Sequence, residues 1–314
     1  MELINDGRPF TARQAARLGW SAVQTSRAVD DGRLRRVIRG VFVDAWVPDS
    51  RELRFAAVRL VAPAHAVACN ETAARLHGID AYAPGERHLL EPSFLVPHAQ
   101  SRMRRPGIRC RQAIVAADDV EHVGGVWVTT PLRTSLDLLR TLYRPYALAS
   151  ADAFVARGLV DRHELVREAH RLKGYRGIVQ ARELATFVDG AAASPGESWM
   201  RLRLLDAGLP RPTLQHEVVG DDGRSRFLDL AYPESLVGAE YDGRRHHTSD
   251  ADVVHDLKRR SELERVHGWR IVVARREDVF GPDPSLEIDV AALLGETARL
   301  PRLWGTAEQR DDAA

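Results

Sequence analysis

Two short apolar runs in the C-terminal third of the chain predict paired β-strands: RFLDLAY at 226–232 and LVGAEYD at 236–242. Each run is apolar enough for a buried strand, and the Pro-Glu-Ser sequence between them favours a hairpin. A hairpin centred between Glu234 and Ser235 places Asp229 directly across from Glu240. Asp242 then falls on the same face as Glu240, because strand side chains alternate with period two.

The segments around this hairpin predict a mixed α/β unit. Ser-Pro-Gly-Glu at 194–197 matches a capping box, with glutamate at the third helical position and a stripe of Trp and Leu following it. A strand at 214–219 precedes the hairpin, a charged helix at 250–267 follows it, and 269–274 reads as a further buried strand. The order helix, three strands, helix, strand predicts a sheet with helices on at least one face.

The first 48 residues predict two helices and a hairpin. Residues 10–18 begin with a threonine cap and have helical spacing of apolar residues, and Ser21 caps a second helix that stops at Gly32. Residues 33–44 suit a two-stranded hairpin around Arg-Gly. This is the outline of a winged helix-turn-helix, whose second helix enters the major groove while its wing touches phosphates.

On this hypothesis the second helix presents Gln24, Thr25 and Arg27 to the bases of duplex DNA. The phosphate contacts come from the arginines of the hairpin, namely Arg33, Arg35, Arg36 and Arg39. The alternative is a small helical protein-interaction domain with solvated arginines. The arginines lie where a wing needs them, which favours DNA binding.

The middle of the chain is less informative. Residues 49–190 read as mixed helix and strand, and the arginine-rich 101–111 fits either a solvated loop or a phosphate contact. Small residues with Pro and Gly at 190–196 form a linker. We therefore predict three domains: a winged helix-turn-helix at 1–48, a mixed domain at 49–190 and a C-terminal α/β domain at 191–314.

Composition describes an ordinary soluble protein, with 44% apolar and 28% charged residues among 314. No run approaches a membrane span and the first ten residues lack the core of a signal peptide, so we expect a cytoplasmic protein with no membrane partner. The net charge of +1 conceals basic segments: residues 92–117 hold five arginines and no acid. Cys69 and Cys110 lack metal-ligand spacing and are expected to be buried thiols.

Three carboxylates on one face of an apolar sheet carry candidate chemistry. Asp229, Glu240 and Asp242 would repel each other and lose hydration there, and a divalent cation bound by oxygen ligands relieves both costs. For any one of these acids a solvated strand end is the simpler explanation. All three together, followed by the pair His246-His247, favour a metal site.

Residues 194–280 resemble the PD-(D/E)xK restriction-endonuclease-like superfamily, in the branch similar to very-short-patch mismatch repair endonucleases. The matching residues are Glu197, Asp229, Glu240-Tyr241-Asp242-Gly243, His246, His247, Asp256, Arg259 and Gly268-Trp269. The resemblance implies that Asp229 and Glu240 ligate Mg²⁺ (or Mn²⁺), with Glu197 helping through water. The capping box alone also explains the position of Glu197.

The sequence departs from this superfamily at Asp242, where the pattern expects lysine. Lys258 could serve as a relocated catalytic lysine, or His246 or His247 could supply general acid–base help. Alternatively Asp242 is a third metal ligand and Lys258 a surface charge.

Residues 1–48 and the domain after them resemble the AbiEi-type antitoxins of type IV toxin–antitoxin systems, through FTARQAARLG, the next helix and RRVIRGVFV. The overall expectation is a multidomain α+β or α/β protein that binds DNA and hydrolyses its phosphodiester bonds with Mg²⁺. The alternative is a non-enzymatic regulator or antitoxin with a degenerate nuclease domain, which would add a cognate toxin as a partner. RNA as substrate and the oligomeric state stay open.

Overall fold

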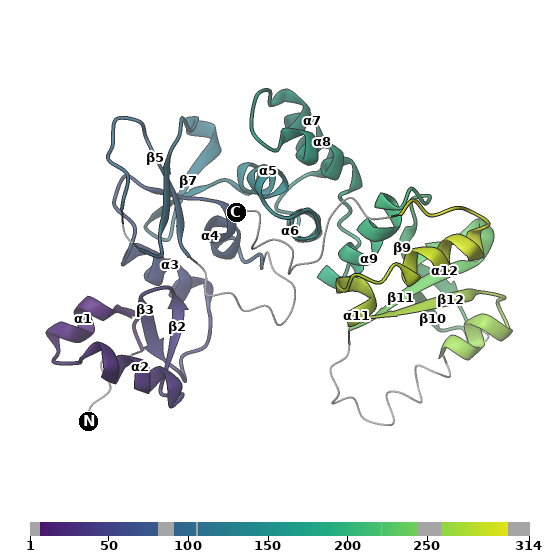
Figure 1. Cartoon of the computed structure of the whole chain (residues 1–314), viewed down its shortest axis with the longest axis horizontal. Helices are drawn as coiled ribbons and strands as arrows, with labels where there is room; N and C mark the ends of the chain where they lie inside the picture. Colours follow the sequence, from purple (N-terminus) through teal and green to yellow (C-terminus); the bar gives the residue numbers. More distant parts are fainter. Residues whose placement is uncertain (1–6, 81–90, 105, 221, 244–258, 301–314) are drawn as a thin grey trace. The chain divides into compact units, whose positions relative to one another are not determined.

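The structure, a computed structural model, describes residues 7–80, 91–104, 106–220, 222–243 and 259–300. It divides the chain into two compact units (Figure 1). Unit 1 comprises Met1–Thr141 and Leu159–Ala181, and unit 2 comprises Leu142–Gly158 and Arg182–Ala314. Both units mix helices with sheet, which confirms the predicted mixed architecture. Among the described residues no helix is both long and apolar enough to cross a membrane.

The N-terminal part of unit 1 is a three-stranded sheet with two helices. Its elements are β1 (Phe10–Thr11), α1 (Ala12–Arg17), α2 (Ala22–Asp30), β2 (Leu34–Ile38) and β3 (Val41–Asp44). The strand order is β1-β3-β2, and both pairings are antiparallel. Thr11 and Ser21 cap the two helices, as the sequence predicts, and each forms a reciprocal capping box with the glutamine three residues later.

The rest of unit 1 is built on a five-stranded sheet of order β6-β5-β4-β8-β7. The strands are β4 (Val67–Ala68), β5 (Ser93–Val96), β6 (Arg109–Gln112), β7 (Val120–Val123) and β8 (Val126–Thr129). The helices are α3 (Arg51–Arg59), α4 (Asn70–Leu76), α5 (Pro131–Thr141) and α7 (Arg162–Arg171). Val37 and Val41 of the β2–β3 hairpin share one hydrophobic cluster with Phe55 and Phe94, so the hairpin packs on the same core as the middle sheet.

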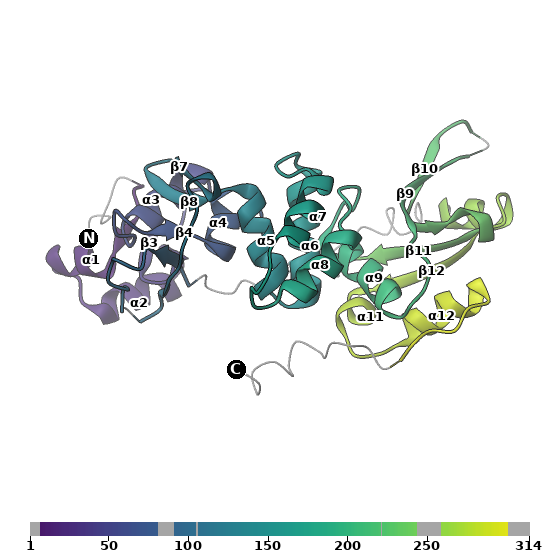
Figure 2. The same ribbon diagram turned by 90° about the horizontal axis from the view of Figure 1, so that it is seen from above.

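Unit 2 contains a four-stranded sheet of order β12-β11-β10-β9. Its strands are β9 (Thr213–Val219), β10 (Ser225–Tyr232), β11 (Val237–Asp242) and β12 (Arg270–Arg275), with helices α6 (Arg144–Ala156), α9 (Pro195–Asp206), α11 (Arg276–Phe280) and α12 (Ser285–Leu294). Helix α8 (Ile178–Phe187) spans the division between the units. Strands β9, β10 and β11 pair antiparallel, while β12 runs parallel to β11. The β9–β10 hairpin projects from the rest of the sheet (Figure 2).

The hairpin predicted at 226–242 is confirmed in its position and its register. Leu230 pairs with Ala239 and Tyr232 with Val237, which is the register that a turn centred between Glu234 and Ser235 requires. Residues 259–265 are helical and precede β12. Leu263 of this helix packs with Leu228 and Trp269, so the helix covers part of the sheet.

Buried ion pairs hold the helices of unit 2 together. The side chain of Arg203 on α9 is fully buried and pairs with Glu287 on α12, with Nε to Oε1 at 2.8 Å. Arg201 on the same helix pairs with Asp152 of α6 at 2.5 Å. Arg203 also donates to backbone carbonyls and Arg201 to that of Phe187, which offsets part of the cost of burying these charges.

Candidate functional site

Three residues of helix α2 were expected to face DNA bases. One of them is exposed, and its side chain makes no contact that helps to hold the described part of the fold. Arg27 is exposed and makes no ion pair with the residues that the structure describes. Gln24 is exposed, but its Oε1 accepts a hydrogen bond from the Ser21 amide at 2.7 Å as part of the helix cap. The expectation for Thr25 is wrong, because this residue is 4% exposed and its hydroxyl donates to the Ser21 carbonyl at 3.1 Å. Its place on the inner face of α2 removes it from any base contact.

Two of the hairpin arginines, one in β2 and one just before it, are exposed on the surface. Arg36 is exposed and has no ion-pair partner among the described residues. Arg33 is exposed and lies 3.1 Å from Asp31, a pair in which both side chains are about half solvated. Such an exposed pair is weak, on the order of 0 to 1 kcal/mol, so Arg33 can exchange its partner for a phosphate.

The other two hairpin arginines are engaged within unit 1. Arg35 is half-buried and donates to the Val47 carbonyl from Nε at 3.2 Å and Nη2 at 2.8 Å. Arg39 is half exposed and forms an ion pair with Glu91. Of the four arginines assigned to phosphates, Arg35 and Arg39 are therefore engaged in contacts within unit 1.

In unit 2 the predicted carboxylates gather where β10 and β11 separate. Their paired register ends at Leu230 and Ala239, one position before Asp229 and Glu240 would face each other. There the Asp229 Oδ2 accepts a hydrogen bond from the Tyr241 amide at 2.8 Å. The Asp229 carboxylate thus accepts the hydrogen bond that a backbone carbonyl of β10 would otherwise accept from β11. This bond fixes the position of the side chain.

Glu197, on the first turn of α9, points to the same place. It is 6% exposed, and its Oε2 accepts hydrogen bonds from the Ala193 amide and from Gln215 Nε2, both at 2.9 Å. The same Gln215 nitrogen lies 3.5 Å from Asp229 Oδ1. The amide of Gln215 therefore links the two acids.

Gln215 was not foreseen as a site residue. It lies within β9 and yet has a φ of +46°, a left-handed conformation that side chains other than glycine rarely adopt. A strand glutamine gives no signal in the sequence, and its conformation and its two acidic neighbours appear only in the folded sheet. Backbone outliers of this kind concentrate at functional sites.

Close packing brings α9 to β11 at this point. A Cβ added at Gly196 would lie 2.1 Å from Cε1 of Tyr241, so only glycine allows the helix to begin directly against this ring. The neighbouring Glu197 is thereby held beside the strands. The glycine of the predicted capping box thus has a tertiary role that the cap alone does not explain.

The surroundings of Asp229 change its acidity. The pKa of Asp229 is raised to about 6, mainly by burial and to a smaller extent by the negative charges of Glu197 and Glu240. The hydrogen bond from the Tyr241 amide and the positive charge of Arg259 act in the opposite direction. A carboxyl group with this pKa can exchange a proton near neutral pH.

Glu240 is neutralised by two arginines: Arg259, which the resemblance included without a role, and Arg260, which the sequence did not single out. It is 4% exposed, and Arg259 binds both of its oxygens, with Nη1 at 2.7 Å and Nη2 at 2.9 Å. Arg260 Nε adds a third contact at 2.9 Å. Both arginines come from the helical residues 259–265. The charge repulsion expected for three bare carboxylates is relieved here by guanidinium groups.

The remaining predicted residues are only partly placed. Asp242 is half-buried at the end of β11, opposite Arg275 of β12. His246, His247 and Lys258 lie outside the described residues. Within the described ranges no three His, Cys, Asp or Glu side chains are grouped to hold a metal ion. The metal site of Asp229, Glu240, Asp242 and Glu197 stays a prediction.

Comparison with known proteins gives two family matches. Residues 1–43 match the family described as "Transcriptional regulator, AbiEi antitoxin", and residues 66–187 match the family described as "AbiEi antitoxin C-terminal domain". These matches confirm the resemblance predicted for residues 1–48 and 49–190.

Two curated proteins of Mycobacterium tuberculosis are similar to most of the chain. They are the uncharacterized protein MT2308 of strain CDC 1551 / Oshkosh and the uncharacterized protein Rv2248 of strain ATCC 25618 / H37Rv. Each is 37% identical over 252 residues, which is 80% of this chain and 89% of the relative. Because 252 residues exceed the length of 1–190, the similarity extends into the C-terminal sheet region.

Proposed function

Because the chain belongs to the AbiEi antitoxin family, we propose that it is a transcriptional regulator that binds duplex DNA through its N-terminal sheet and helices. We also propose that it serves as the antitoxin of a toxin–antitoxin pair. The observation that carries the DNA-binding part is the exposed guanidinium group of Arg36, on a strand directly after helix α2 and its exposed Arg27. A cognate toxin would be the second partner. This function is the alternative that the sequence left open, and the family matches favour it over a nuclease.

The arrangement of the N-terminal elements supports this proposal. Two capped helices joined by a short turn, followed by a hairpin and a sheet of order β1-β3-β2, are the elements that a winged helix-turn-helix requires. In that geometry α2 enters the major groove and the β2–β3 hairpin lies along the backbone. Arg27 then contacts bases, while Arg33 and Arg36 contact phosphates.

Fluorescence anisotropy tests the DNA-binding part directly. The full chain is titrated onto labelled duplex DNA taken from upstream of its own gene and onto a scrambled duplex of equal length. We expect binding to both duplexes at low salt and a preference for the upstream duplex as salt rises, because phosphate contacts weaken with salt while base contacts persist. The Arg27→Gln variant should lose the preference between the two duplexes. Failure of the wild-type protein to bind either duplex at low salt contradicts the proposal.

A toxicity assay tests the antitoxin part separately. The chain is expressed together with a growth-inhibiting protein encoded beside it, and growth is compared with expression of that protein alone. We expect rescue by the wild-type chain. An Arg36→Ala variant that still rescues growth would separate neutralisation of the toxin from DNA binding, and absence of rescue by the wild-type chain contradicts this part.

The cluster of Glu197, Gln215 and Asp229 beside Glu240 favours a second candidate, a metal-dependent nuclease. Carboxylate oxygens are the ligands that Mg²⁺ and Mn²⁺ prefer, and Asp229 with Glu240 would hold the ion while Glu197 acts through water. The ion would activate water for attack on the scissile phosphate. Glu240 must first give up, or share, its contacts with Arg259 and Arg260.

A plasmid assay decides this second candidate. Supercoiled DNA is incubated with the protein and Mg²⁺ or Mn²⁺, beside the Asp229→Asn variant and an RNA of similar size. Nicking by the wild-type protein and not by the variant supports hydrolysis by this site. Intact plasmid and intact RNA under all conditions would leave the regulator as the function of the chain.

A further inference from the structure

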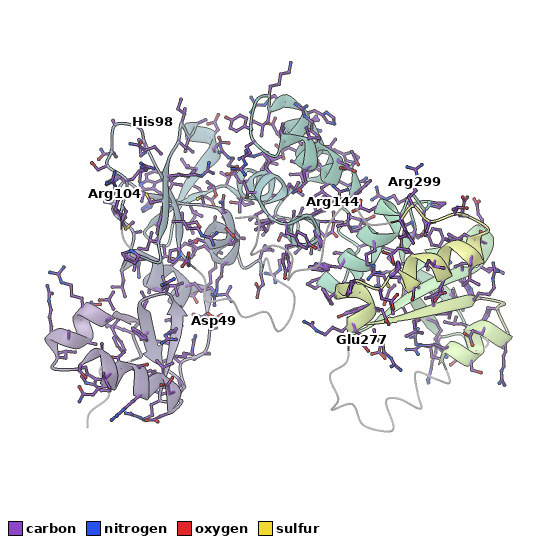
Figure 3. All side chains as sticks on the ribbon, in the orientation of Figure 1. Asp49, His98, Arg104, Arg144, Glu277 and Arg299 are labelled. Atoms are coloured by element: carbon purple, nitrogen blue, oxygen red, sulfur yellow. The ribbon has the colours of Figure 1, made fainter. Side chains whose placement is uncertain are left out.

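A second basic element lies beside the β2–β3 hairpin in unit 1. It consists of residues 101–104 and 106–112, which we call the arginine segment. Arg102, Arg104 and Arg111 are exposed, and no acid occurs between residues 92 and 117. Figure 3 shows Arg104 at the outer edge of unit 1. The family match at residues 1–43 does not include this segment.

The arginine segment is anchored rather than loose. Met103, Ile108 and Cys110 are half-buried and pack against the hydrophobic core of unit 1. The residues that alternate with them are arginines, and they are exposed. The segment ends in β6, an edge strand that pairs with β5 on one side. Fixed backbone positions therefore hold the guanidinium groups outward.

The segment is joined to the tip of the hairpin that we propose binds DNA. A Cβ added at Gly107 would lie 2.2 Å from Cδ of Arg39, so the stem of Arg39 packs directly over this glycine. Glu91 completes the connection, because it pairs both with Arg39 and with Arg109, whose Nε lies 3.4 Å from its Oε2. Two positive elements far apart in sequence thus share one acid and lie side by side.

We propose that the arginine segment contacts the phosphates of bound duplex DNA and extends the DNA-binding surface from the β2–β3 hairpin onto the five-stranded sheet. This inference rests on the proposed DNA-binding function of residues 7–48. Arg102, Arg104 and Arg111 each supply a planar, permanently charged donor group suited to phosphate oxygens. These arginines are expected to add affinity without reading sequence, since phosphate contacts carry no base information.

Duplex DNA fits this surface better than an acidic protein does. The segment continues the hairpin surface, whereas a protein interface usually centres on buried apolar or aromatic anchors. Between residues 101 and 112 the described exposed side chains are polar or charged apart from Pro106. Protection of an edge strand by charge is the competing explanation for Arg109 and Arg111, but it does not apply to Arg102 and Arg104, which precede the strand.

The test uses the full chain and two matched double variants in unit 1. Arg102→Gln with Arg104→Gln removes two charges from the loop before β6. Arg167→Gln with Arg171→Gln removes two charges from exposed positions of α7 and is the control. Binding to a non-specific duplex is measured by anisotropy at several salt concentrations, and thermal melts confirm that each variant folds. Arg111→Gln repeats the test from a second part of the segment.

We expect the loop variant to bind more weakly and to flatten the slope of log K against log salt by about two units or less. The control variant should keep the wild-type slope. The loss should be equal on upstream and scrambled duplexes. A wild-type slope in both the loop variant and Arg111→Gln overturns the inference while leaving the proposed function intact.

The remaining outcomes are equally decisive. If the wild-type protein binds no DNA, the proposed function itself fails and the inference fails with it. If the loop variant binds DNA normally but no longer rescues growth in the toxicity assay, the partner of the segment is a protein and the inference is wrong.

Discussion

Asp229 is the residue whose environment departs most clearly from that of a solvated acid in the C-terminal sheet. Its pKa of about 6 in the folded chain compares with about 3.9 in an unfolded one. The folded protein therefore holds this proton more tightly, and stability falls as pH rises from about 4 to about 6. Above that range the penalty is constant, at about 3 kcal/mol or less.

The Asp229→Asn variant should remove this penalty. Asparagine keeps an oxygen that accepts from the Tyr241 amide, but it carries no charge to repel Glu197 and Glu240. We expect the variant to be more stable than the wild-type protein at pH 8 and to keep only about a third of that advantage at pH 4.5, measured by urea unfolding without metal. Glu234→Gln, on the exposed turn between the same strands, controls for general loss of negative charge. If the difference in unfolding free energy between the variant and the wild-type protein is the same at both pH values, the raised pKa of Asp229 is contradicted.

The same residue distinguishes the two candidate functions. A bound cation favours the ionised form of Asp229 and stabilises the fold by mass action, roughly 2.7 kcal/mol at a hundredfold excess over its dissociation constant. Mg²⁺ would then raise the melting temperature of the wild-type protein more than that of Asp229→Asn. Equal melting temperatures with and without Mg²⁺ or Mn²⁺ would leave Arg259 and Arg260 as the counter-ions of this site.

Between elements, the start of helix α9 and strand β11 are matched through Gly196 and Tyr241. Gly196→Ala should improve helix propensity by up to roughly 1 kcal/mol and yet destabilise the protein overall, because the new methyl group meets the tyrosine ring. The displaced helix should carry Glu197 away from Asp229, which lowers the pKa of Asp229. Urea unfolding and an NMR titration of Asp229 measure the two effects.

A double variant checks the cause. Adding Tyr241→Ala to Gly196→Ala opens space for the methyl group, so the two changes together should cost less than the sum of each alone. Additive losses would show that the ring is not the obstacle.

Helices α9 and α12 depend on one fully buried ion pair. Arg203→Met leaves the Glu287 carboxylate buried without its partner, and we expect a loss of about 3 to 5 kcal/mol. Arg203→Met combined with Glu287→Leu removes both charges and should recover part of that loss, measured by urea unfolding. A double variant no more stable than the single one would show that the backbone carbonyls bound by Arg203 matter more than the pair.

For the whole molecule, ionic strength is the variable that reports DNA binding. Arg36→Ala removes one exposed charge from the hairpin and should flatten the slope of log K against log salt by about one unit or less. Arg265→Ala, exposed in unit 2, is the matched control. DNA affinity that does not vary with salt would exclude phosphate contacts as its main source.

Local patterns determined a substantial part of this protein. The caps at Thr11 and Ser21 and the register of the β10–β11 hairpin follow from residues within a few positions of one another, because helix ends and tight turns are closed by near neighbours. The kinship of residues 1–48 and 49–190 with AbiEi antitoxins was likewise visible in the sequence.

Only the tertiary structure decided which side chains are available for chemistry. Burial of Thr25, the pairing of Arg39 with Glu91 and the capture of Glu240 by Arg259 depend on which elements pack together. The left-handed Gln215 between two acids depends on the same packing. These contacts join residues from about 18 to more than 50 positions apart. Periodicity assigns a side chain to one face of its own element, but the partner on that face comes from another part of the chain and is fixed only when the two elements meet.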